Sequence, residues 1–178
     1  MRKGTNREAA NLWRRPSRIV LAVSIDESDK PNIIVLGWKM QTSIHPPMVA
    51  ISIGKTRYSH GLLLSSGEFV LAIPGRDLAE EVLYCGTHSG RDVDKFKETN
   101  LTAISASKVK PPLIKECIAN IECKIVGNLD TGDHTIFVGE VQANWVSEEE
   151  QKNLLSIGQE AGYEIMLDKK GRRFGVIR

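Results

Sequence analysis

The stretch GWKMQTSIHPPMVAISIGKTRYSH, residues 37–60, contains the most informative pattern in this chain. It predicts the end of one strand, a polar loop, a second strand and a basic turn that leads into a helix. The two consecutive prolines end the loop, because proline fits neither a helix interior nor a central strand. After them, alternation places Val49, Ile51 and Ile53 on one face of the strand and smaller side chains on the other. The face with small side chains leaves room for a flat ligand or a closely packed backbone.

The turn that follows the strand carries two cations, a phenol and a hydroxyl: Lys55, Arg57, Tyr58 and Ser59. A helix N-terminus offers free N–H groups and the positive end of the helix dipole, so these residues are a candidate phosphate site. The alternative is structural. In that interpretation the turn is solvated and Ser59 is the N-cap of the helix.

Outward from this stretch, the chain shows many short strands and few helices. Alternating residues predict a hairpin from strands at 18–25 and 33–37, and further segments are predicted as strands at 68–73, 118–126, 134–145, 163–167 and 173–177. Short helices are predicted at 59–65, at 77–85 and after Ser147, where Glu150 completes a capping-box pattern. Because helices do not alternate with strands, an antiparallel β-barrel with short helical insertions is favoured over a parallel sheet.

Length and composition indicate one globular domain. The 178 residues divide into an N-terminal tail or short helix at 1–15 and a single domain at 16–178. A net charge of +2 gives no support for nucleic-acid binding, and no apolar run is long enough for a membrane span. Three cysteines without a CxxC pattern favour a reducing, cytoplasmic compartment and predict no metal site. The basic residues near both termini are either solvated or form a positive rim around an anionic ligand.

The order and spacing of several landmarks resemble the flavin reductase-like family, the FMN-binding split barrels that include flavoredoxins. The landmarks are the Trp38 loop before the Pro-Pro strand, the Lys55–Ser59 turn, the strand ending in Ile73-Pro74, SGRDVDKF at 89–96 and HTIFVGEV at 134–141. This resemblance covers roughly residues 16–145. It implies a Greek-key barrel of about six strands, a homodimer, and FMN near the dimer interface.

The same resemblance assigns candidate site residues. It places Gly37, Trp38, Lys39 and Met40 against the flavin ring, Thr42 and Ser43 beside the ribityl chain or the pyrimidine edge, and Ser52, Lys55, Tyr58 and Ser59 at the phosphate. It also brings Ser89, Gly90, Arg91 and Lys95 toward the flavin. The cations among them would stabilise negative charge on a reduced flavin.

His134 opens a strand that carries a histidine near the site of hydride transfer in flavin reductases of this family. It is a catalytic candidate, able to orient nicotinamide or protonate flavin, or else a strand-end histidine paired with Asp133. Trp38 likewise either stacks on the ring or is a core aromatic residue.

The resulting expectation is an FMN-binding oxidoreductase. It would reduce flavin with NADH or NADPH, or pass electrons to a small-molecule, metal or protein acceptor. One alternative is a flavin carrier or sensor without turnover. Another is a flavin-free interaction module, because Ala72 replaces an asparagine common in relatives and Lys39–Gln41 are bulkier than usual there.

Overall fold

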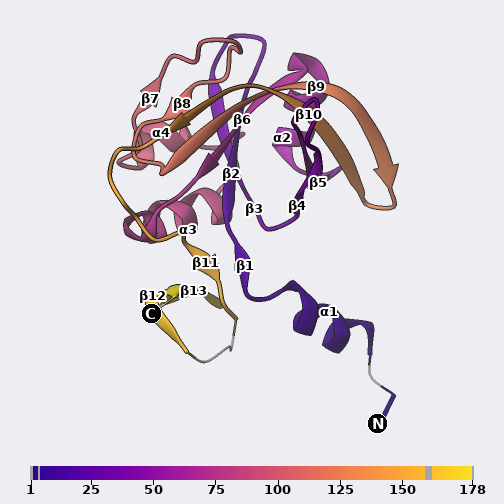
Figure 1. The fold of residues 1–178 in the computed structure, drawn as a ribbon, viewed down its shortest axis with the longest axis vertical. Helices are drawn as coiled ribbons and strands as arrows, with labels where there is room; N and C mark the ends of the chain where they lie inside the picture. Colours follow the sequence, from indigo (N-terminus) through magenta and orange to yellow (C-terminus); the bar gives the residue numbers. More distant parts are fainter. Residues whose placement is uncertain (1, 4, 159–161, 178) are drawn as a thin grey trace.

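Within the described residues, 2–3, 5–158 and 162–177, the computed structural model has a main sheet of seven antiparallel strands (Figure 1). In spatial order they are β3 (Pro31–Leu36), β2 (Val20–Ile25), β6 (Glu68–Ile73), β9 (Ala119–Thr131), β10 (His134–Val146), β5 (Met48–Gly54) and β4 (Lys39–Ser43). The helices are α1 (Asn6–Arg14), α2 (Tyr58–Ser66), η1 (Arg76–Leu78), α3 (Ala79–Thr87) and α4 (Lys95–Glu98). The expected mainly antiparallel β fold with helical insertions is confirmed.

Two smaller sheets complete the topology of the described residues. One contains β1 (Ser17–Arg18), β11 (Leu155–Ser156), β13 (Arg172–Ile177) and β12 (Tyr163–Lys169), in that order. The other joins β7 (Ala103–Ile104) to β8 (Leu113–Ile114). The first of these, called the terminal sheet below, connects the two ends of the chain, because β1 pairs directly with β11. Figure 1 shows α1 and the terminal sheet below the barrel.

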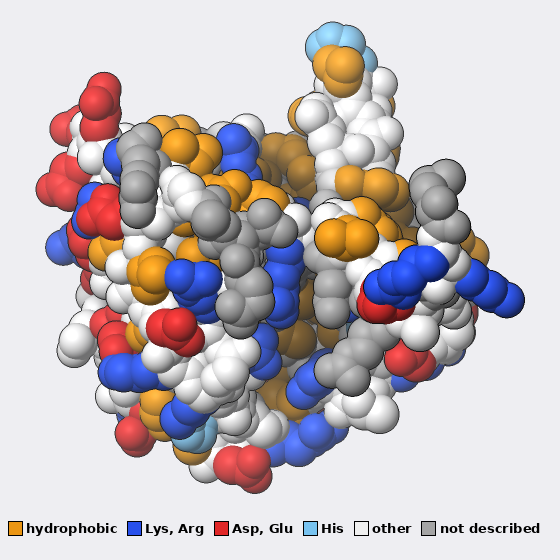
Figure 2. Space-filling view, turned by 90° about the horizontal axis from the view of Figure 1, so that it is seen from below, with side chains coloured by type: hydrophobic (Ala, Val, Ile, Leu, Met, Phe, Trp, Pro, Cys, Tyr) orange, Lys and Arg blue, Asp and Glu red, His pale blue; other side chains and the backbone are white. Residues whose placement is uncertain are grey.

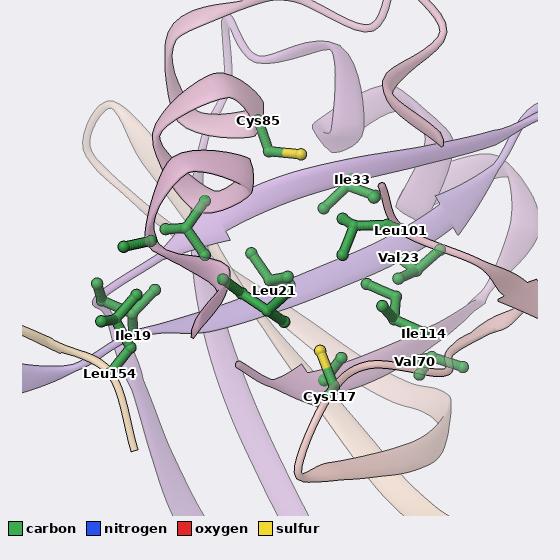
Figure 3. Packing of buried hydrophobic residues seen from close by; sticks show 14 of the residues in the cluster. Ile19, Leu21, Val23, Ile33, Val70, Cys85, Leu101, Ile114, Cys117 and Leu154 are labelled. Carbon is green, nitrogen blue, oxygen red and sulfur yellow. The ribbon is translucent and has the colours of Figure 1, made fainter. Parts of the chain in front are cut away.

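Apolar side chains pack on both faces of β2, β3 and β6. Inside the barrel, Phe69 and Phe137 are fully buried and meet Leu63 of α2. On the outer face, α3 and the segment leading to β9 cover a second cluster (Figure 3). In that cluster Cys85 and Cys117 lie among aliphatic side chains. Both faces of these strands are therefore buried, which explains why β2 is buried along its whole length.

The long β9–β10 hairpin passes close to a core ring at Gly139. A Cβ atom added to Gly139 would lie 2.6 Å from ring atoms of Phe69. The pairing of β10 with β9 also shifts register between Val138 and Gly139. Only glycine allows this close approach of the strand to the aromatic core.

Glu122 is a fully buried carboxylate on β9. Its oxygens accept hydrogen bonds from the backbone N–H groups of residues 107, 108 and 109, from the Ser107 hydroxyl and from the Trp145 indole. Burial alone raises its pKa, but these hydrogen bonds together hold the pKa below the usual value of 4.5. The carboxylate thus fastens the loop before β8 to the barrel.

Two expectations from the sequence are wrong. Residues 38–45 were expected to form a polar loop, but Lys39–Ser43 form β4, because polar side chains are tolerated on an edge strand that pairs only with β5. Nor does a helix follow Ser147 in the described residues. Its hydroxyl accepts from the N–H of Glu149, and the chain then runs beside Pro74 and Gly75 before it enters the terminal sheet.

The described helices include none with the length and apolar character that a bilayer crossing requires. All three cysteines are buried free thiols. Burial raises the pKa of each thiol, to about 11 for Cys85 and about 12 for Cys123. They act as core residues.

Candidate functional site

A cavity of about 820 Å³ lies between the barrel and the terminal sheet. Its barrel wall consists of the chain from Gly37 to Met40 together with Ala50, Ile51 and Ser52 of β5 and Ile136 of β10. Its terminal wall consists of residues 13–17 together with Ser156, Arg172 and Phe174. On the side that carries α1 and the terminal sheet, Figure 2 shows a groove bordered by Lys and Arg side chains.

β5 contributes two small side chains to the barrel wall. Ala50 and Ser52 line the cavity, as the alternation in the sequence predicts for the small face of this strand. The N–H of Ser52 donates to the carbonyl of Trp38 at 3.0 Å, which fixes the loop against β5. The Trp38 ring is 47 % exposed and lies 4.6 Å from the His134 ring, centroid to centroid. An aromatic surface and a backbone edge therefore face the cavity together.

The terminal wall brings positive charge to the same cavity. Arg14, Arg15 and Arg172 line it, and Lys39 adds a fourth cation from the barrel wall. None of the described residues that line the cavity is Asp or Glu. Burial, together with the neighbouring charge of Arg18, lowers the pKa of Lys39, whose ammonium donates to the Arg18 carbonyl at 2.6 Å. This arrangement favours an anionic ligand with an aromatic ring.

A second group of polar residues surrounds the start of α2. Lys55 is exposed, and its ammonium lies 3.2 Å from the Asp130 carboxylate. Arg91 lies over the Tyr58 ring, with 5.2 Å between the guanidinium carbon and the ring centroid. The loop at 89–91 and the turn at 55–59, separate in sequence, therefore meet here. This group does not line the cavity.

Ser59 has a structural role in this arrangement. It is 3 % exposed and accepts a hydrogen bond of 2.7 Å from the side chain of Asn32. The N-cap of α2 is Arg57, so the interpretation of Ser59 as N-cap is wrong. Gly90 packs closely on Asn32, the hydrogen-bond partner of Ser59. A Cβ atom added at Gly90 would lie 1.9 Å from the Asn32 amide oxygen. That oxygen is buried and has no partner among the described residues.

His134 connects the two groups of residues. Its Nδ1 donates to the Asp133 carboxylate at 2.7 Å, and this hydrogen bond is the largest cause that lowers the pKa of Asp133. Its ring lies against Trp38 on one side and near Gly54 on the other. Both interpretations of His134 fit in part, since it pairs with Asp133 and also borders the aromatic edge of the barrel wall.

Lys95 differs most from its expected place beside the flavin. Its side chain is 4 % exposed, and its ammonium donates to the carbonyls of Ile33 and Cys85. Burial lowers its pKa. This ammonium holds α3 and α4 against β3, so it is not available to a ligand.

The sequence-predicted residues thus fall into three sets. Five line the cavity: Gly37, Trp38, Lys39, Met40 and Ser52. Others gather at the start of α2 or on the adjoining loop: Lys55, Tyr58, Ser59, Ser89, Gly90 and Arg91. Four residues belong to neither group. Thr42 and Ser43 lie further along β4, and His134 and Lys95 lie on β10 and α4, all outside the cavity lining.

The terminal wall was missed as a specific site. Its only signal in the sequence is the clustering of basic residues near both termini, for which a solvated role is favoured over a positive rim around an anionic ligand. The structure places Arg15 and Arg172 at one cavity, and the positive rim stays a hypothesis. The described residues contain no group of three or more His, Cys, Asp or Glu side chains placed to hold a metal ion.

The sequence model of a protein family, the flavin reductase like domain, matches residues 13–171 of this chain. The chain belongs to the flavin reductase-like family. An uncharacterized protein of Archaeoglobus fulgidus is 44% identical over 126 residues, which cover 71% of this chain and 70% of that protein. The NADH-dependent FAD reductase of Streptomyces globisporus is 31% identical over 100 residues, covering 56% of this chain and 54% of that protein.

Solved structures of flavin reductase-like proteins have the same fold. Flavoredoxin from Methanosarcina acetivorans superposes with a TM-score of 0.80 at 24% identity, covering 100% of this chain and 91% of that one. An FMN-binding protein from Thermus thermophilus superposes with a TM-score of 0.76 at 26% identity, covering 91% of this chain and 86% of that one. The expected split barrel is confirmed.

Proposed function

We propose that this flavin reductase-like protein is an FMN-binding oxidoreductase that uses NADH or NADPH, or a protein, metal or small-molecule electron partner. The cavity is the observation that carries the proposal. Its small side chains on β5, the Trp38 ring and the backbone at 37–40 suit a planar heteroaromatic ring. The resemblance to an FMN-binding protein and a flavoredoxin supports the same cofactor.

The residues present fit FMN. Gly37–Met40 would contact the ring, and Ser52 would provide a hydroxyl at the cavity face. Lys55, Tyr58 and Arg91 would bind the phosphate beyond the cavity, where a cation and hydroxyl donors are already grouped. FMN is favoured over FAD because nothing in the sequence indicates a separate adenosine-binding segment.

Bound flavin would supply the redox chemistry. The protein would position the flavin and stabilise the negative charge of its reduced form. The barrel wall would exclude water from one face of the ring, and Lys39 would place positive charge nearby. His134, held by Asp133, would orient a ligand at the edge of Trp38 or hold a proton at Nε2.

A second copy of the chain would complete the site. Large apolar side chains are exposed on β4, on the segment after it and on β9, including Met40 at 60 %, Ile44 at 70 % and Leu129 at 62 %. An exposed apolar face of this kind is typical of a subunit interface. We propose a homodimer, with flavin near this interface, in a reducing cytoplasm. Light scattering coupled to size exclusion would measure its mass.

The test is an absorption spectrum of the purified protein before and after excess FMN and desalting. Retained bands of oxidised flavin are expected, followed by oxidation of NADH or NADPH in the presence of an acceptor. A protein that neither retains FMN nor turns over with added FMN would contradict the proposal and favour the flavin-free interaction module. Tight retention without turnover would favour a carrier or sensor.

A further inference from the structure

The terminal wall carries arginines to which the proposed binding of FMN assigns no role. The FMN phosphate is assigned to Lys55 and its neighbours, which are not part of the cavity lining. Arg15 and Arg172 come from opposite ends of the chain and both line the cavity. Their placement on one wall depends on the pairing of β1 with β11, which ties the N-terminal segment to the terminal sheet.

Among the described residues, no carboxylate neutralises these two arginines. In the described part of the chain, neither the Arg15 nor the Arg172 side chain has a hydrogen bond or an ion pair. The adjacent Arg173 already pairs with Asp168 at 3.6 Å, and no carboxylate is among the described residues that line the cavity. Unneutralised cations in a cleft attract anions, and paired guanidinium groups suit a phosphate best.

Aromatic surface accompanies the charge. Trp13 and Phe174 also belong to the terminal wall, and the Trp13 side chain is 81 % exposed. An exposed indole beside two arginines offers a stacking surface for a nucleobase next to a phosphate site. The cavity volume of about 820 Å³ leaves room for a second ring beside the flavin.

We propose that Arg15 and Arg172 bind the 2′-phosphate of NADPH, so that the protein prefers NADPH to NADH. The proposal rests on the proposed oxidoreductase function. The two dinucleotides differ only in this phosphate, which adds about 1.5–2 negative charges at neutral pH. The terminal wall is therefore a specificity-determining surface, whereas the barrel wall contacts the redox ring.

The test is calorimetric binding of NADP⁺ and NAD⁺, which need no turnover, to both flavin-loaded and flavin-free protein. We expect NADP⁺ to bind at least tenfold more tightly than NAD⁺. Arg15→Ala and Arg172→Ala should each reduce this ratio to below threefold and leave NAD⁺ affinity nearly unchanged. Arg172→Lys should retain part of the preference, because lysine keeps the charge without the bidentate geometry.

Lys115→Ala is the matched control, since it removes an exposed positive charge outside the cavity lining. It should leave the ratio unchanged. Equal affinities for NADP⁺ and NAD⁺, no binding of either dinucleotide, or a preference that survives both alanine variants would overturn the proposal. FMN titration separates this result from the function itself, because an intact FMN affinity with no NADP⁺ preference would refute only the role of the arginines.

Discussion

The barrel wall of the cavity is a continuous sheet, whereas the terminal wall joins two chain ends through the two-residue pairing of β1 with β11. β5 pairs with β10 along its whole length, and the side chains of Ile51 and Ile53 are buried in the barrel core. Arg15 and Arg172 are exposed and have no partner in the described residues. The contacts that stabilise the fold also set the shape of the barrel wall. The charges of Arg15 and Arg172 on the terminal wall take no part in such contacts among the described residues.

The comparison predicts that substitutions in the barrel change the free energy of unfolding more than substitutions in the terminal wall. Glu122→Ala should lower the free energy of unfolding by roughly 3–5 kcal/mol, because several buried N–H donors and the Trp145 indole lose their acceptor. Urea denaturation would measure the change. Glu148→Ala, on an exposed segment, is the control and should change stability by less than about 0.5 kcal/mol. A small effect of Glu122→Ala would mean that the loop before β8 is not fastened by this carboxylate.

Flavin affinity should depend next on the phosphate group at α2. Lys55→Ala should weaken FMN binding by roughly 1.5–3 kcal/mol, as expected for the loss of a charged hydrogen bond. Quenching of flavin fluorescence would measure the dissociation constant, with Lys115→Ala as control.

Asp130→Asn sharpens this test. It removes the carboxylate that competes for Lys55 and keeps an acceptor for the Thr135 hydroxyl, so FMN should bind more tightly than in the parent protein. If Lys55→Ala left the dissociation constant unchanged, the phosphate would have to bind elsewhere.

Acid should weaken the barrel side through Glu122. Its folded pKa is lowered, so its contribution to stability is complete above the unfolded value of about 4.5 and is lost as pH falls through the folded pKa. Glu122→Gln should therefore have a flatter stability profile than the parent protein below about pH 5. Chemical denaturation at a series of pH values would show it. Parallel profiles for the two proteins would assign the acid sensitivity to other carboxylates.

The smallest stability effect is expected on the terminal side. Arg172→Ala should change the free energy of unfolding by less than about 0.5 kcal/mol, since the side chain is exposed and unpaired in the described residues. The melting temperature should then move by no more than about 2 °C. A much larger shift would mean that the terminal wall supports the barrel, and the division between the two walls would no longer hold.

The strands that build the barrel wall were predictable from sequence. Alternation at 48–53 identified β5, the apolar stretch at 134–145 identified β10, and the small residues Ala50 and Ser52 marked the face that lines the cavity. These features are local, because a strand exposes every second side chain to the same environment. The family landmarks likewise located Gly37–Met40 at the site.

Other features depended on contacts between distant residues. β4 forms where a polar loop was expected, because β5 is available as its partner. The sequence motif at 89–96 predicts that Lys95 binds a ligand, yet its ammonium donates to the Ile33 and Cys85 carbonyls in the interior. Ser59 was assigned to a phosphate, but it is buried against Asn32.

By itself, the sequence determined the barrel strands, the family and the small side chains that β5 presents to the cavity, because periodicity and short motifs act over neighbouring residues. Only the tertiary structure decided which cations face the cavity. Arg15 and Arg172 are separated by almost the whole chain, and the terminal sheet brings them to one wall. Burial and pairing decide whether a charged side chain supports the fold or remains free for a ligand, and neither can be read from residue type alone.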